Sequence, residues 1–68
     1  MNLNDIIELE LKKESRIELE KEDSTILVYY VGLNYNKQLK KDEILFRQSK
    51  GGNVFHYLIP YIKKINKL

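Results

Sequence analysis

The chain contains few residues that could do chemistry: one histidine, His56, three serines and a set of carboxylates. An imidazole becomes catalytic when a nucleophile lies beside it, and it binds a metal when other ligands lie near. The serines, Ser15, Ser24 and Ser49, occur in turn-like segments without a nucleophile motif, and the chain has no cysteine. We therefore expect no enzyme activity, no metal and no cofactor, and we interpret His56 as a structural or surface residue.

The glycine pair in "SKGGN" (49–53) lies next to a lysine, as in loops that bind phosphate. Such loops need defined spacings, either G-x-x-x-x-G-K-[ST] or G-x-G-x-x-G, and neither spacing is present. The pair is better interpreted as a turn that begins the last structural element.

Tyrosines and lysines are the residues best suited to binding, because aromatic rings stack on bases while lysines attract phosphates. Tyr29 and Tyr30 are adjacent on a predicted strand, so they must face opposite sides and only one of them can be in the core. Tyr35, in "NYNKQLKK", is the clearest surface tyrosine. The candidate residues for binding a partner or nucleic acid are Tyr35, Lys37, Lys40, Lys41, Arg47, Lys50, Lys63 and Lys64.

The net charge of +2 conceals two halves of opposite sign. Residues 1–23 carry eight acids against four bases, a net charge of −4, and residues 24–68 carry eight bases against two acids, a net charge of +6. The halves could attract each other within the fold. Alternatively, the basic half offers a face to an anionic partner, or the acidic half offers one to a basic partner.

Length and composition indicate one small domain, 1–68, close to the lower size limit for unaided folding. The lack of cysteines excludes disulfides and fits a reducing cytoplasm. No apolar run approaches the roughly 20 residues of a membrane helix, so we expect a soluble protein without membrane contact.

Hydrophobic periodicity predicts the first part of the fold. A helix begins in "NLNDIIELELKKES", capped by Asn2, Asn4 or Asp5, and buries one apolar face. "SRIELEKE" alternates as a strand with Ile17 and Leu19 on one side. We then expect a central strand at 25–33 whose Gly32 marks a bulge or frayed end, a basic loop at 34–42 and a third strand at 43–48.

The last segment, 53–68, is ambiguous. An apolar stripe at helical spacing predicts one helix, bent or restarted at Pro60, and consists of Val54, Leu58, Tyr61, Ile62, Ile65 and Leu68. The alternative is a fourth strand at 53–59, in a hairpin closed by the glycines, followed by a short helix from Pro60. We favour the first reading. The predicted fold class is therefore α+β, a two-layer domain of helix, three-stranded antiparallel sheet and helix (αβββα).

That order of elements looks like a double-stranded-RNA-binding domain. In that family the second helix opens with a lysine cluster that grips phosphates, whereas this chain reads "GGNVFHYL" there. Lys63 and Lys64 follow one or two turns later. The resemblance implies a nucleic-acid-binding module that uses the basic half.

A second resemblance rests on "MNLNDII", "KKESRIELEKEDSTI" and "EILFRQSKGGNVFHYLIPYIKK". Together these segments are similar to a small phage anti-CRISPR protein family that blocks the type II effector nuclease. The similarity is a pattern of apolar positions over most of the chain and includes the αβββα order of elements. Identities concentrate in Met1, Asn2, Asn4, Asp5 and Ile7. Members that imitate DNA are acidic in the loops and second half, whereas this chain is basic there. The resemblance implies a phage origin and a host protein, such as a CRISPR effector nuclease, as the partner.

Two hypotheses of function follow. The first is a small non-catalytic phage-type inhibitor in the cytoplasm of a bacterial host, which binds and blocks a protein that handles nucleic acid. The alternative is a nucleic-acid-binding module. A homodimer formed through a sheet edge is compatible with both.

Overall fold

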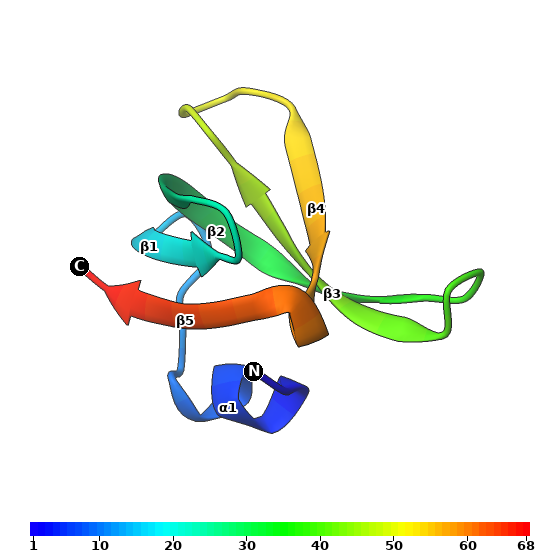
Figure 1. Cartoon of the computed structure of the whole chain (residues 1–68). Coiled ribbons are helices and arrows are strands. Elements are labelled where there is room, and N and C mark those ends of the chain that lie inside the picture. Colours follow the sequence, from blue (N-terminus) through cyan, green and yellow to red (C-terminus); the bar gives the residue numbers. More distant parts are fainter.

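The computed structural model describes residues 1–68 and contains one short helix and five strands (Figure 1). The elements in chain order are α1 (Leu3–Glu8), β1 (Arg16–Lys21), β2 (Thr25–Asn36), β3 (Lys41–Arg47), β4 (Val54–Leu58), the 3₁₀ turn η1 (Ile59–Tyr61) and β5 (Ile62–Lys67). All strands form one antiparallel sheet in the order β4-β3-β2-β1-β5. The αβββα prediction is wrong, because the domain is mostly β and has no C-terminal helix.

The hairpin of β1 and β2 confirms the alternation seen in the sequence. Ile17 lies opposite Val28 and Leu19 opposite Ile26, so the apolar side chains of both strands face the core. Residues 22–24 form the turn. As expected for a central strand, β2 pairs on both sides, with β1 and with β3.

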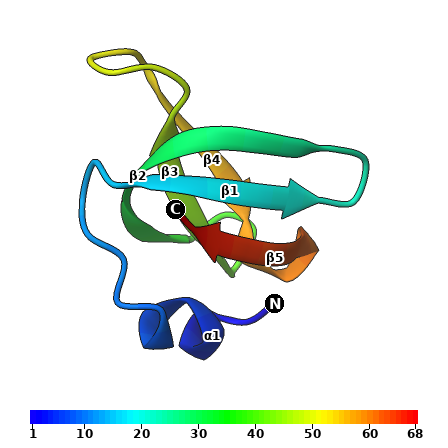
Figure 2. The same ribbon diagram turned by 90° about the vertical axis from the view of Figure 1, so that its left-hand side faces the viewer.

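A bulge divides β2 into two halves. Tyr30 pairs with Phe46 and Gly32 with Leu45, so Val31 has no partner on β3. The half before the bulge pairs mainly with β1 and the half after it with β3. Bulges increase twist and bend a strand, and Figure 2 shows the sheet strongly curved, with β3 and β4 behind β1 and β5.

The basic loop predicted at 34–42 is a hairpin instead. β2 continues to Asn36 and β3 begins at Lys41, so only four residues turn. The side-chain oxygen of Asn36 accepts a hydrogen bond from the backbone N–H of Leu39 at 3.0 Å, and Lys40 adopts a left-handed conformation with φ of 53°. Asn at the start of a tight turn forms this bond readily. The polar residues 34–36 and 41–42 therefore belong to paired strands and not to a loop.

The C-terminal segment forms β4, η1 and β5 instead of the predicted helix, and a bulge in β5 explains the helix-like spacing of its apolar residues. Lys64 pairs with Glu20 and Ile62 with Lys21, which leaves Lys63 without a partner on β1. The extra residue lets Ile62 and Ile65, three positions apart, both face the core. Val54, Tyr61 and Leu68 of the predicted stripe are exposed instead.

The alternative prediction for this segment, a fourth strand at 53–59 followed by a short helix from Pro60, is correct for the strand, which is β4. It is wrong for the helix, because β5 follows a single 3₁₀ turn. The glycines close a hairpin between β3 and β4, where Gly51 has φ of 72°, a conformation that favours glycine. Pro60 lies in the single turn of η1, and the chain then becomes extended.

The helix α1 covers one side of the curved sheet beside β5, as both ribbon views show. Of the three predicted caps, Asn2 is the one that caps the helix, in a reciprocal capping box with Asp5. Ile6 joins the core, which consists of Ile6, Ile17, Leu19, Val28, Tyr30, Ile44, Phe46, Ile59, Ile62 and Ile65. No helix has the length and apolar character needed to cross a membrane.

Candidate functional site

Two adjoining hollows lie between α1 and the β2–β3 hairpin. The larger has a volume of about 330 Å³ and is lined by Met1, Asn2, Leu3, Lys40, Lys41, Asp42, Ile59 and Pro60. The smaller, of about 200 Å³, is lined by Leu3, Ile7, Leu33, Asn34, Tyr35 and Asp42. Because Leu3 and Asp42 line both, the hollows form one continuous surface, which we call the hairpin groove.

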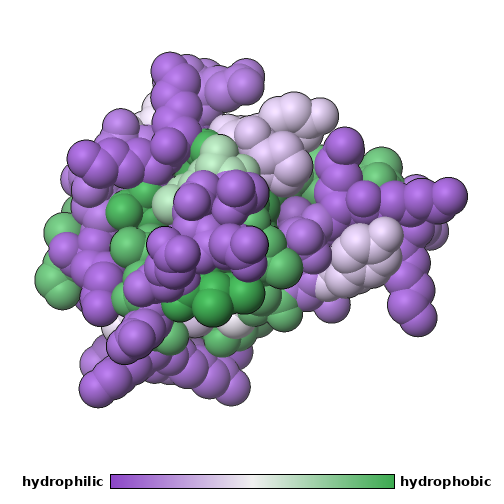
Figure 3. Space-filling view, turned by 90° about the horizontal axis from the view of Figure 1, so that it is seen from below, coloured by the Kyte–Doolittle hydropathy of each residue, from purple (hydrophilic) through white to green (hydrophobic).

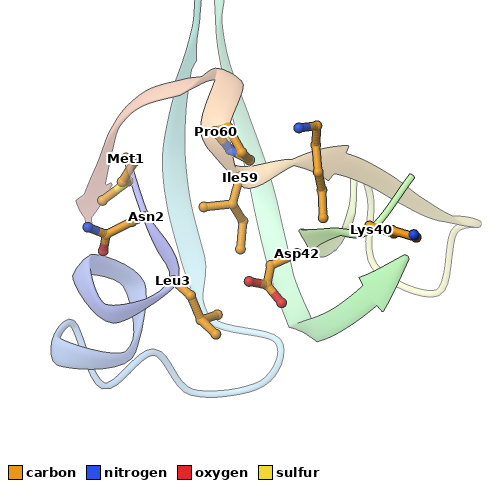
Figure 4. A pocket seen from close by; sticks show the side chains of 8 residues that line it. Met1, Asn2, Leu3, Lys40, Asp42, Ile59 and Pro60 are labelled. Atoms are coloured by element: carbon orange, nitrogen blue, oxygen red, sulfur yellow. The ribbon is translucent and has the colours of Figure 1, made fainter. Parts of the chain in front are cut away.

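Three elements far apart in the sequence build the hairpin groove. Figure 4 shows Leu3 from α1, Asp42 from β3 and Ile59 from η1 facing the hollow, with Lys40 at the rim. The capping box of α1 orients its first turn, and the left-handed Lys40 ends the hairpin turn. The helix cap thus positions the apolar Leu3, and the turn conformation positions the charged Lys40.

The groove is bordered by apolar side chains that the fold leaves exposed. Ile7 of α1 and Tyr35 of β2 line it, and Leu39 lies in the hairpin turn; each of the three is more than half exposed. Figure 3, which views this side of the molecule, shows hydrophobic surface between hydrophilic side chains. Exposed apolar groups gathered at a groove are typical of a surface that contacts another molecule.

The structure separates the eight predicted binding residues into three groups. Tyr35, Lys37, Lys40 and Lys41 gather at the β2–β3 hairpin, where Tyr35, Lys40 and Lys41 line the groove. Arg47 and Lys50 lie near the opposite β3–β4 turn, whereas Lys63 and Lys64 lie on β5. The predicted set is therefore not one continuous patch.

Arg47 is engaged within the fold. Its Nε donates to the carbonyl oxygen of Gly52 at 3.0 Å, and its guanidinium forms an ion pair with Glu14. The pair ties the chain before β1 to the end of β3. Arg47 therefore has a structural contact that the hairpin lysines lack.

The charge asymmetry of the two halves is not neutralised by pairing. The ion pairs of the structure are Glu14–Arg47 and Glu43–His56, and no lysine lies within ion-pair distance of a carboxylate. Only Glu14–Arg47 joins the acidic half to the basic half. Direct ion pairs thus account for little of the charge split, although β5 lies beside β1 and places Lys64 opposite Glu20. The lysines of the hairpin groove form no ion pair and are available to a partner.

A buried carboxylate that the sequence reading missed lies behind the groove. Glu43 is 5% exposed, and its two oxygens accept hydrogen bonds from Asn34 Nδ2 at 2.9 Å and Asn36 Nδ2 at 3.4 Å. Nδ1 of His56 lies 3.1 Å from Oε2. The hydrogen bond from Asn34, followed by those from Asn36 and His56, lowers the pKa of Glu43 although burial opposes the shift.

The Glu43 cluster stabilises the sheet beside the groove. Asn34 and Glu43 are direct partners across β2 and β3, and His56 reaches over from β4. The only hint in the sequence was the i, i+2 spacing of Asn34 and Asn36, which places both on one face once β2 is known to continue. Neither here nor elsewhere in the structure does a group of three or more His, Cys, Asp or Glu side chains lie placed to hold a metal ion.

The tyrosine prediction is confirmed for the adjacent pair. Tyr30 lies in the core, and Tyr29 lies on the opposite face, where the Arg16 guanidinium carbon is 4.9 Å from its ring centroid. Tyr61, which was assigned to the apolar stripe, is exposed beside Pro60.

The strand order and the groove define a small, mostly β domain with a mixed apolar and basic surface on one side. No protein-family model matches the chain, and neither does any curated protein or solved structure. The strand order therefore defines the fold class, a small and mostly β domain, without a family assignment.

Proposed function

We propose that this protein is a non-catalytic inhibitor that binds one host protein stoichiometrically and blocks it. The observation that carries the proposal is the hairpin groove, where exposed apolar side chains lie beside lysines without ion-pair partners. The resemblance to a phage anti-CRISPR family suggests a nucleic-acid-handling target, such as a type II effector nuclease, in the cytoplasm of a bacterial host.

The chemistry of the groove favours a protein surface as the ligand. Tyr35 and Ile7 offer apolar area that a partner side chain can cover, and tyrosine is enriched among residues that dominate binding energy. Lys40 and Lys41 line the adjoining hollow together with Asp42, and Lys37 lies in the same hairpin turn. These lysines would steer an acidic rim of the partner toward the groove. A partner with an apolar projection framed by carboxylates would match both features.

The positions of the hydroxyl groups support a non-catalytic role. Ser15 Oγ donates to the carbonyl oxygen of Lys12 at 2.6 Å, and Ser24 Oγ donates to the neighbouring Asp23 carboxylate at 3.3 Å. His56 faces Glu43 rather than a hydroxyl. A nucleophile activated by a base requires these groups to be in contact.

The resemblance to double-stranded-RNA-binding domains loses its basis, because it rested on an element order that the fold lacks. The anti-CRISPR resemblance loses the same shared order and rests on its sequence segments alone. Direct nucleic-acid binding through the same lysines becomes an outcome of the test. It would show as binding to DNA or RNA alone that weakens steeply with salt.

The test is a cleavage assay with a guide-loaded type II effector nuclease and increasing amounts of this protein. We expect inhibition that saturates at one inhibitor per nuclease. Lys37→Glu/Lys40→Glu/Lys41→Glu, the hairpin variant, should lose inhibition while keeping its fold, because exposed positions in the turn and at the start of β3 contribute little to stability.

The matched control is Lys50→Glu/Lys63→Glu/Lys67→Glu, which makes the same charge change at exposed positions away from the groove and should inhibit like the parent. The inhibitor proposal fails if the parent does not inhibit the nuclease and the immobilised parent also retains no host protein. Salt-sensitive binding to DNA or RNA alone would replace it with the nucleic-acid-binding function.

A further inference from the structure

The two edges of the sheet differ in how they are protected against pairing with another strand. β4 pairs with β3 alone, and β5 pairs with β1 alone. An edge strand presents unpaired backbone N–H and C=O groups, and proteins usually protect such edges with lysines, prolines or bulges. The edge at β5 has all three: Lys63, Lys64 and Lys67, the bulge at Lys63, and Pro60 just before the strand.

The β4 strand itself carries none of these protections, although Nζ of Lys21 on β1 lies 5.4 Å from the ring centroid of Tyr57. Its sequence is "VFHYL", without lysine, proline, glycine or acid, and its pairing with β3 has no register shift. Val54 and Phe55 are 45% and 43% exposed. Figure 1 shows β3 on one side of β4 and no strand on the other. A regular, uncharged edge of this kind is a template for an added strand.

We propose that two copies of this protein pair through β4, antiparallel, around a two-fold axis at His56. Antiparallel pairing about the middle residue of a five-residue strand places His56 opposite the His56 of the other copy. It places Phe55 opposite Tyr57 and Val54 opposite Leu58. The two curved sheets become one continuous sheet of ten strands.

Self-complementarity is the reason for choosing a second copy as the occupant. The register joins aromatic to aromatic and aliphatic to aliphatic, which are the cross-strand pairs that stabilise antiparallel strands. It brings no lysine or carboxylate of β4 opposite a like charge. A two-fold interface uses the same patch on both copies, and the symmetry of β4 about its central residue fits that requirement.

Neighbouring residues prepare the edge for this pairing. The Phe55 ring stacks on Phe46, with ring centroids 6.1 Å apart, so Tyr57 of the second copy would extend an existing aromatic stack. Each His56 is held on its own subunit by Glu43 at 3.1 Å. The hairpin groove contains no β4 residue, so the dimer does not depend on the proposed inhibitory function.

The absence of cysteine from the chain allows a direct test of both the interface and its register. Cα atoms of opposite residues in antiparallel strands are about 4.5–5.5 Å apart, within the range that a disulfide bridges. His56→Cys should therefore form a disulfide-linked dimer under mild oxidation. Thr25→Cys, on the exposed start of β2, is the matched control and should crosslink at least about ten-fold more slowly.

A mixture of Val54→Cys and Leu58→Cys proteins tests the register without changing His56. The mixture should give crosslinked heterodimers, whereas Val54→Cys alone should not, because its two copies would lie roughly 13 Å apart along the strands. Crosslinking of Val54→Cys alone, or of Thr25→Cys as fast as His56→Cys, would overturn the proposed pairing.

Sedimentation velocity tests association of the parent without any crosslink. A concentration-dependent monomer–dimer equilibrium is expected, and His56→Lys should weaken it several-fold because like charges meet at the axis. Thr25→Lys, which adds the same charge elsewhere, should associate like the parent. Circular dichroism confirms that each variant is folded. A parent that stays monomeric up to millimolar concentration, or assembles beyond a dimer, contradicts the proposal.

Discussion

Replacing Glu43 by Gln should destabilise the domain although the two side chains have nearly the same shape. Glu43 is almost fully buried, and Asn34 and Asn36 donate to its oxygens while His56 lies in contact. The Gln amide can accept from one asparagine, but its NH₂ group then faces donors instead of acceptors. Loss of charge-assisted bonds to a buried group costs about 1–3 kcal/mol.

That cost is a large share of what a domain of this size possesses. At about 0.05–0.15 kcal/mol per residue, 68 residues give a total stability of roughly 3–10 kcal/mol. Each kcal/mol shifts the melting temperature of such a domain by about 4–8 °C. Thermal and urea unfolding of Glu43→Gln at pH 7 should therefore show a clear loss, whereas Glu22→Gln in the exposed β1–β2 turn should match the parent.

The same variant should behave differently in acid. Because the folded-state pKa of Glu43 is lowered, its ionised form stabilises the fold above the ordinary carboxyl pKa of 4.5, and this contribution is lost as the pH falls through the lowered value. The difference between parent and Glu43→Gln should accordingly shrink below pH 4.5. If Glu43→Gln melts like the parent at pH 7, or the difference persists unchanged in acid, the reasoning is wrong.

Further expectations concern the central strand, the glycine turn and the hairpin groove. Val28→Ala should lower the free energy of unfolding by about 1–3 kcal/mol, because Val28 is fully buried. Leu27→Ala, at a side chain that is 50% exposed, should lower it by less than about 1 kcal/mol in urea unfolding. Equal losses would contradict the register of β2. Gly51→Ala should cost about 1 kcal/mol, since alanine is strained at φ of 72°, and an unchanged midpoint would refute this. For the hairpin variant, the association rate with the partner should fall more than the dissociation rate changes, and the loss should shrink at high salt.

Local patterns were sufficient to predict the first half of the fold. Alternation at Ile17 and Leu19 predicted β1, and the β-branched, aromatic run around Val28 predicted a central strand. The capping residues predicted α1, although it ends at Glu8. These predictions succeeded because each apolar pattern directly reflects which side of a single element faces the core.

The second half could not be predicted in the same way. Ile62 and Ile65 are three residues apart, which favours a helix, and only their pairing with β1 reveals that Lys63 is bulged out. The length of β2 was underestimated because Asn34 and Asn36 read as loop residues, whereas Glu43 satisfies their amides across the sheet. In both places a long-range partner overrides the local preference.

The candidate site was found only in part. Tyr35 and the lysines of "NYNKQLKK" lie together as the sequence suggested, but Leu3, Ile59 and Pro60 come from distant segments. Arg47, equally basic in the sequence, is engaged with Glu14 and Gly52. Charge and residue type indicate which side chains can bind, and contacts decide which of them are free.

By itself the sequence determined a single small domain, its charge asymmetry, the apolar strands that form the centre and the turn at the glycines. Only the tertiary structure decided that the C-terminal segment is extended, that Glu43 is buried among polar partners, and that α1, β3 and η1 enclose a groove. The physical reason is the range of the interactions. Helix caps and side-chain alternation depend on near neighbours, whereas strand pairing, bulges and burial depend on residues that meet only when the sheet curves.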